Sequence, residues 1–150
     1  MADLRPILLV EDNPRDLELT LAALAKCQLA NKIVVARDGA EALDYLYVRG
    51  DHADRIPGDP AVVLLDLKLP KVDGIEVLEQ VKRDPSQRQI PVVMLTSSRE
   101  ERDLVRSYEL GVNAFVVKPV DFNAFFEAIQ DLGMFWAILN EPPPRLSYGS

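Results

Sequence analysis

The sequence predicts a doubly wound α/β fold, in which helices cover both faces of a parallel sheet. Five short apolar runs rich in β-branched residues recur along the chain, and none alternates apolar with polar side chains. Each run therefore predicts a strand that is buried on both faces. Segments with helical periodicity separate the runs, and this alternation is typical of right-handed crossovers on a parallel sheet. The five predicted strands are 7–10, 33–36, 62–65, 92–95 and 115–117.

The first two helices begin at recognisable caps. Asn13 followed by Pro14 is typical of an N-cap and a first-turn proline, and residues 38–41, Asp-Gly-Ala-Glu, have the spacing of a capping box. Residues 49–60 contain two glycines and two prolines and predict a surface loop before the third strand. The apolar faces of the two helices are Leu17, Leu21 and Leu24 in the first, and Ala42, Leu43 and Leu46 in the second.

The third and fourth helices also have clear ends. The third must end before Pro85, because a proline disfavours helical backbone at the residue before it. The fourth begins at Ser98, with Glu101 three positions later as in a capping box, and ends at Gly111. The residues along their inner faces are Val77, Leu78 and Val81 in the third helix, and Leu104 and Tyr108 in the fourth.

The last helix is expected to be elongated and to begin after Asp121. Prolines in the final stretch exclude a helix there. We therefore divide the chain into one domain, residues 1–139, and a proline-rich C-terminal tail, residues 140–150, which leaves no room for an output domain. The apolar stripe of the last helix is Phe122, Phe125, Phe126, Ile129, Leu132 and Trp136.

The composition narrows the classes of function. At 150 residues, with 48% apolar and 27% charged residues, the chain fits one globular domain. A net charge of −7 argues against nucleic acid as a partner, because a chain without a basic surplus neutralises few phosphates. No apolar run is long enough to span a membrane, and the single cysteine, Cys27, suits a reducing compartment. We therefore expect a cytoplasmic protein.

Candidate site residues follow the first, third, fourth and fifth predicted strands. Glu11 and Asp12 follow the first strand, Asp66 the third, Thr96 the fourth and Lys118 the fifth. Taken singly, each has an ordinary explanation, such as a helix cap, a turn or a solvated strand end. Together they fall where open α/β sheets bind ligands, beyond the carboxyl ends of the strands. We therefore expect one site.

The charges at this site need compensation. If the first and third strands are neighbours, three carboxylates converge, and two unit charges roughly 5 Å apart repel by about 3 kcal/mol at an effective dielectric constant of 20. Lys118 is the positive group within the fold. A second is a hard divalent cation, for which oxygen ligands are the right chemistry. With few protein ligands, Mg²⁺ that keeps several waters fits best.

The chain resembles the receiver family of two-component signalling over roughly residues 6–132. The resemblance lies in segments 7–12, 64–70, 93–97 and 115–119. It implies a flavodoxin-like sheet with strand order 2-1-3-4-5 and a single-domain response regulator, not an enzyme, whose partner is a sensor histidine kinase. More narrowly, the chain resembles the regulators paired with phytochrome-type kinases. The shared features are the Glu-Asp-Asn-Pro opening, the extended loop before the third strand, Lys-Pro-Val-Asp and the aromatic pair Phe135-Trp136 near the end.

The resemblance also implies roles for the site residues. Asp66 accepts the phosphoryl group, and Lys118 pairs with that group. Glu11, Asp12 and Asp66 hold Mg²⁺, and Lys68 adds its backbone carbonyl. As a further hypothesis, the long Lys68 side chain shields the acyl phosphate from water.

Two residues are expected to act as the switch. Thr96 hydrogen-bonds the phosphoryl oxygen, and Phe115 turns inward when Thr96 moves. Phe115 has no hydroxyl, so this readout is steric. The resemblance also implies a cis peptide bond between Lys118 and Pro119.

The signal is expected to leave through protein contacts. Phe125 and Phe126 are adjacent and cannot both face the core, so a partly exposed apolar patch is expected, and such patches mark interfaces. We predict a homodimer that uses the fourth helix, the fifth strand, the last helix and the tail, with Phe122, Phe126, Phe135 and Trp136 at the interface. The alternative is that the tail folds back and covers the patch.

Three other functions were weighed. A pseudo-receiver would be a phosphorylation-independent interaction module, but such a scaffold has no use for three crowded carboxylates. A haloacid-dehalogenase-type hydrolase needs a second acid two residues after its nucleophile, where this chain has Lys68. A flavin carrier would need a phosphate-binding loop after the first strand, which this sequence lacks.

Overall fold

Five parallel strands form one sheet in the order β2-β1-β3-β4-β5, which confirms the predicted flavodoxin-like order. The computed structural model describes residues 5–27, 29, 31–101, 105, 112 and 114–132. Each strand begins and ends within one residue of its predicted bounds. The strands are β1 (Ile7–Val10), β2 (Ile33–Ala36), β3 (Val62–Asp66), β4 (Val92–Thr96) and β5 (Ala114–Val117).

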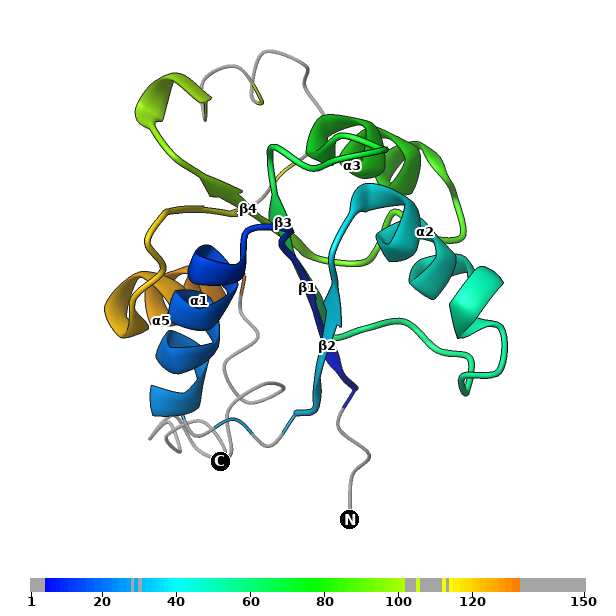
Figure 1. Cartoon of the computed structure of the whole chain (residues 1–150), viewed down its shortest axis with the longest axis horizontal. Helices are drawn as coiled ribbons and strands as arrows, with labels where there is room; N and C mark the ends of the chain where they lie inside the picture. Colours follow the sequence, from blue (N-terminus) through cyan, green and yellow to red (C-terminus); the bar gives the residue numbers. More distant parts are fainter. Residues whose placement is uncertain are drawn as a thin grey trace, which may run out of the picture.

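Helices pack on both faces of the sheet, as a doubly wound fold requires. Helices α1 and α5 lie on one face, and α2 and α3 lie on the other (Figure 1). Residues 99–101 and 105, which follow β4, are also helical. The helices are α1 (Pro14–Lys26), α2 (Gly39–Tyr47), the short 3-10 helix η1 (Gly50–His52), α3 (Gly74–Arg83) and α5 (Phe122–Asp131).

The helices begin at the predicted caps. Asn13 Oδ1 accepts hydrogen bonds from two backbone N–H groups of the first turn of α1, at 2.9 and 3.0 Å. Asp38 and Asp121 cap α2 and α5 in the same way. Ser98 Oγ accepts from the backbone N–H of Glu101, so the predicted Ser98 cap after β4 is also formed. These bonds satisfy N–H groups that a helix leaves without an internal partner.

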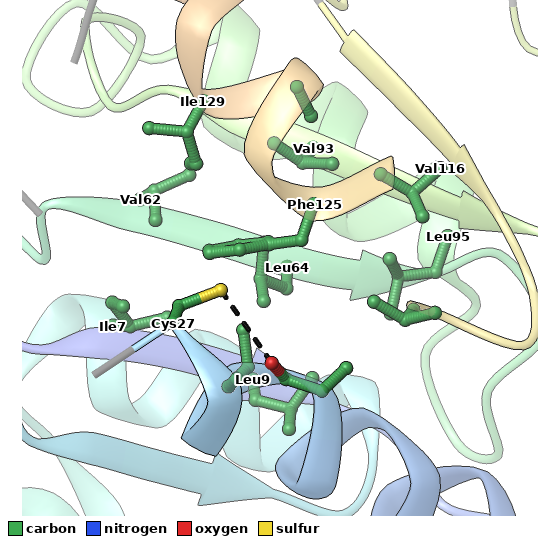
Figure 2. Packing of buried hydrophobic residues seen from close by; sticks show 14 of the residues in the cluster. Ile7, Leu9, Cys27, Val62, Leu64, Val93, Leu95, Val116, Phe125 and Ile129 are labelled. Carbon is green, nitrogen blue, oxygen red and sulfur yellow. Dashed lines mark hydrogen bonds between the residues drawn. The ribbon is translucent and has the colours of Figure 1, made fainter. Parts of the chain in front are cut away.

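Alternate residues of the buried strands supply two separate cores. Leu9 and Leu64 face α1 and α5 and surround Phe125, which is 1% exposed (Figure 2). Leu8 and Leu65 point to the opposite face and pack among the apolar residues of α2 and α3. The period of two along each strand produces this division, and it explains why the strand sequences are apolar throughout.

The last helix divides its two adjacent phenylalanines as predicted. Phe125 is buried, whereas Phe126 is half-buried and stacks on Phe122, with 5.7 Å between the ring centroids. Phe122 is 37% exposed. The described part of α5 ends at Asp131, so the elongated helix and the tail stay predictions. The predicted residues that lie outside the described residues are Leu104, Tyr108, Gly111, Phe135, Trp136 and 140–150.

Candidate functional site

Strand register brings the predicted site residues to one edge of the sheet. Val10 of β1 is the register partner of Leu65 of β3. The next residues along the two strands, Glu11 and Asp66, therefore lie side by side. Parallel strands end at the same edge, and β4 and β5 therefore contribute Thr96 and Lys118 to this edge as well.

Three carboxylates form a cluster at this edge. One oxygen of each of Glu11, Asp12 and Asp66 lies within 4.8 Å of the others, which is close enough for a shared cation. Glu11 is fully buried and Asp66 is 4% exposed, whereas Asp12 is exposed to solvent. The donors are all hard oxygens, with no sulfur or imidazole among them, and this set suits Mg²⁺ or Mn²⁺.

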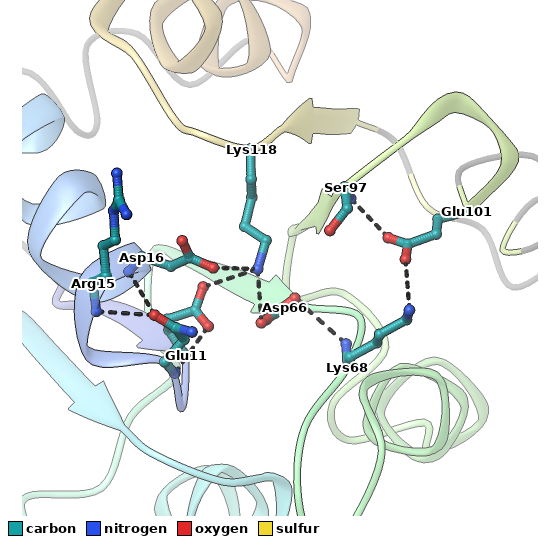
Figure 3. A network of polar contacts seen from close by, with 9 residues as sticks. Glu11, Arg15, Asp16, Asp66, Lys68, Ser97, Glu101 and Lys118 are labelled. Carbon is teal, nitrogen blue, oxygen red and sulfur yellow. Dashed lines mark hydrogen bonds and ion pairs between the residues drawn. The ribbon is translucent and has the colours of Figure 1, made fainter.

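Lys118 places its ammonium among the carboxylates. Its Nζ lies 3.1 Å from Asp66 Oδ2, 3.5 Å from Glu11 Oε1 and 2.9 Å from Asp16 Oδ2 (Figure 3). The Lys118 side chain is 13% exposed. The Lys118–Pro119 peptide bond is cis, as the resemblance implied.

Asp16 is a site residue that the sequence analysis missed. It lies in the first turn of α1, which begins at the same edge of the sheet as the carboxylates. The signal that could have found it is its position four residues after Asp12, within the first turn of a helix that starts beside the acid pair.

Burial and mutual repulsion change the proton affinities of the site. Burial, a hydrogen bond with Asp66 and the Asp66 charge raise the pKa of Glu11 to about 8, against the opposing influence of Lys118. Burial by itself would lower the pKa of Lys118, but hydrogen bonds to Asp16 and Asp66 and the nearby negative charges hold it above its usual value. The site therefore keeps a firmly charged lysine beside a carboxyl that binds its proton more tightly than an exposed glutamate does.

Thr96 and Phe115 lie on the neighbouring strands β4 and β5. Thr96 is fully buried, and its Oγ1 has no hydrogen-bond partner within the described part of the chain. Buried hydroxyl groups are nearly always paired, so this hydroxyl is available to donate a hydrogen bond to a further acceptor. Phe115 is half-buried on β5, against the core on the α2 and α3 face.

Lys68 connects the loop after β3 to the start of the helix after β4. Its backbone N–H donates to Asp66 Oδ1 at 3.4 Å, whereas its Nζ lies 3.2 Å from Glu101 Oε2 and its side chain is 80% exposed. Glu101 also accepts a hydrogen bond from the backbone N–H of Ser97, which together with Lys68 lowers the pKa of Glu101. From the sequence Glu101 is expected only as a capping residue, and this ion pair was not predicted.

Gly74 allows α3 to begin close to the backbone of Asp66. A Cβ at this position would lie 2.2 Å from the backbone oxygen of Asp66 and 2.6 Å from that of Leu67. The Gly74 N–H instead donates to the Leu67 oxygen at 3.0 Å. Any larger residue would displace the backbone that carries Asp66.

Comparison with known proteins places this site in a family. The profile of the response regulator receiver domain matches residues 7–130. The chain therefore belongs to the receiver-domain family. It is a response regulator and not a catalytic enzyme, as the sequence predicted, and a response regulator implies a sensor histidine kinase as partner.

Individual relatives of this response regulator cover nearly all of its length. The bacteriophytochrome response regulator AtBRR is 78% identical, with a TM-score of 0.88, over 93% of this chain and 100% of that one. Response regulator Rcp1 of Synechocystis sp. is 38% identical over 130 residues, 87% of each chain. The Mn²⁺-bound structure of Rcp1 has a TM-score of 0.71 at 36% identity, over 95% of this chain and 99% of that one.

A methanogen protein is a further relative of this response regulator. The probable methanogenesis regulatory protein FilR2 of Methanothrix harundinacea is 41% identical over 137 residues, 91% of this chain and 86% of that protein. Among the described helices of the response regulator, none combines the length and apolar character that crossing a bilayer requires.

Proposed function

We propose that Asp66 accepts a phosphoryl group from a sensor histidine kinase. The observation that carries this proposal is the contact between a buried acceptor carboxylate and the Lys118 ammonium, 3.1 Å apart, beside an acidic cluster. The carboxylate supplies the nucleophile, and the ammonium supplies the charge that phosphoryl transfer needs.

The acidic cluster fits the Mg²⁺ that we propose as the cofactor. Glu11, Asp12 and Asp66 would hold it, together with the backbone carbonyl of Lys68, and the cluster offers three oxygen donors in one place. A bound Mg²⁺ supplies neutralising charge for the phosphoryl oxygens. The Mn²⁺-bound form of the relative Rcp1 supports a divalent cation here.

The transfer itself uses the residues of the chain. An Asp66 oxygen attacks phosphorus and forms a new O–P bond, while the bond from phosphorus to the donor histidine nitrogen breaks and its electron pair stays on the imidazole. Lys118 stabilises the phosphoryl oxygens, because its ammonium already lies at the acceptor.

The switch that we propose begins at Thr96. Its hydroxyl is buried without a partner among the described residues and is available to donate to a phosphoryl oxygen. Movement of Thr96 toward the phosphoryl group leaves space next to β5, and Phe115 turns into that space. Thr96 and Phe115 come from strands paired in the sheet, which supports this coupling.

We propose a bacteriophytochrome as the partner kinase. We also propose that the response regulator acts in the cytoplasm. The support is the 78% identity with a bacteriophytochrome response regulator over that protein's full length. Phosphotransfer from a panel of purified histidine kinases tests this pairing, with bacteriophytochromes expected to transfer fastest. Faster transfer from unrelated kinases would contradict it.

We also propose that the chain forms one domain, residues 1–139, followed by a tail, residues 140–150. A homodimer would form through β5, α5, this tail and the helix that follows β4. The exposed Phe122 ring stacked on Phe126 supports an interface on α5, and Phe135 and Trp136 are proposed to extend it. Light scattering on the full chain and on a version ending at Asn140 tests this, and a monomer at tens of micromolar in both phosphorylation states would refute it.

The phosphoacceptor is tested with acetyl phosphate and Mg²⁺. Intact-mass spectrometry should show a gain of about 80 Da, the mass of one phosphoryl group, that Asp66→Asn abolishes. Asp51→Asn, which changes an exposed carboxylate in η1, is the matched control and should keep the gain. An unmodified wild-type chain, or a modified Asp66→Asn variant, would overturn the assignment and favour a phosphorylation-independent interaction module.

A further inference from the structure

The Lys118 ammonium has one carboxylate neighbour to which the proposed function gives no role. Asp16 Oδ2 lies 2.9 Å from Lys118 Nζ, closer than the oxygens of Asp66 and Glu11 at 3.1 and 3.5 Å. Figure 3 shows that Asp16 reaches the ammonium from α1, whereas Glu11 directly follows β1 and Asp66 is the last residue of β3. An ammonium has three N–H donors, so each carboxylate can accept one.

Asp16 differs from its two neighbours because it stands outside the acidic cluster. Within the described residues, the group of oxygens close enough to share a cation comes from Glu11, Asp12 and Asp66. A cation held there competes with Lys118 for the oxygens of Glu11 and Asp66. Asp16 is free of that competition, and its carboxylate stays with the ammonium.

The backbone of Asp16 is fixed by the start of α1. Its N–H donates to Asn13 Oδ1 at 3.0 Å, within the first turn of the helix. The Asp16 side chain is 31% exposed, so it joins the buried ammonium to the surface. A lysine loses much rotamer freedom when its ammonium is fixed, and a fixed carboxylate can offset that cost before a phosphoryl group arrives.

We propose that Asp16 is a positioning residue for the phosphoryl transfer onto Asp66. It holds the Lys118 ammonium against the acceptor while the other two carboxylates are engaged by cation and phosphoryl group. This inference rests on the proposed function. Asp16 acts through Lys118, and its removal lowers the rate of transfer without removing the nucleophile.

The test compares rates of phosphorylation of the full chain by acetyl phosphate and Mg²⁺. Asp16→Asn, which removes the charge and keeps the shape, is expected to slow the reaction about tenfold, the effect of losing one charge-assisted hydrogen bond. Glu18→Gln removes an exposed carboxylate from the same helix and should react like the wild type. Asp16→Glu keeps the carboxylate and should recover part of the rate.

A second comparison separates positioning from a merely structural effect. With Lys118→Gln as the starting chain, Asp16→Asn should change the residual rate no further, because the group that it positions is gone. An equal loss in both backgrounds, or an unchanged or faster rate in Asp16→Asn alone, overturns the proposal. Urea midpoints check folding, and Asp16→Ser replaces Asp16→Asn if that variant does not fold.

The wild-type chain distinguishes a failure of the role proposed for Asp16 from a failure of the proposed function. Uptake of a phosphoryl group by the wild type together with a normal rate in Asp16→Asn overturns the role of Asp16 alone. No uptake by the wild type overturns the proposed function, and the role of Asp16 with it.

Discussion

Replacing Thr96 by valine is expected to stabilise the resting protein and to weaken its response to phosphorylation. Thr96 is fully buried at the end of β4, and its Oγ1 has no hydrogen-bond partner among the described residues. Valine has nearly the same shape and places a methyl group where threonine has the hydroxyl. The substitution therefore removes a buried polar group without opening a cavity.

The size of the effect follows from the cost of that hydroxyl. A buried polar group without a partner costs about 1–3 kcal/mol of folding free energy, so we expect a gain of about 1–2 kcal/mol for Thr96→Val. For a chain of this length, each kcal/mol raises Tm by about 2–4 °C. The resting variant should therefore melt about 2–8 °C above the wild type.

Thermal and urea unfolding, with and without acetyl phosphate and Mg²⁺, measure both effects. The wild type should gain stability on phosphorylation. Thr96→Val should be more stable than the wild type before phosphorylation and should gain less stability from it. Thr96→Ser is the matched control, because it keeps the hydroxyl, loses a methyl group at about 1 kcal/mol and should keep the response. A resting Thr96→Val less stable than the wild type would refute the unpaired hydroxyl, and an undiminished gain on phosphorylation would refute its role.

Three further outcomes are expected. Lys118→Gln leaves the carboxylates without their ammonium, and the urea midpoint at neutral pH should fall by the equivalent of about 2–3 kcal/mol, partly restored by Mg²⁺; an unchanged midpoint would contradict this account of the charges. Burial raises the pKa of the Cys27 thiol, so the native chain should react with a thiol reagent at about pH 8 far more slowly than the urea-unfolded chain, and equal rates would exclude a buried thiol. Lys68→Ala should shorten the lifetime of phosphorylated Asp66 after acetyl phosphate is removed, measured as the loss of the added mass over time. An unchanged lifetime would contradict the shielding hypothesis.

Local sequence was sufficient to predict most of the fold. A strand buried on both faces must be apolar throughout, which identified all five strands from runs of three or four residues. Caps such as Asn13 and Asp38 bond to N–H groups two or three positions ahead, so these helix starts depend on residues near in sequence. The meeting of Glu11, Asp66 and Lys118 followed from a single topological fact, the shared edge at which parallel strands end.

The partners of individual side chains were not predictable in this way. Asp16 and Lys118 are 102 residues apart in sequence, and their 2.9 Å contact depends on how α1 docks against the sheet. The ion pair between Lys68 and Glu101 likewise joins the loop after β3 to the first turn of the helix after β4, which no local pattern relates.

The sequence by itself determined the order of strands and helices and the type of residue at each strand end, because those features depend on periodicity and on neighbouring residues. Only the tertiary structure decided that Asp16 is the closest carboxylate to Lys118 and that the Thr96 hydroxyl is buried without a partner among the described residues. The physical reason is that hydrogen bonds and ion pairs require atoms to meet within a few tenths of an ångström, and that precision arises only when packed elements fix their side chains.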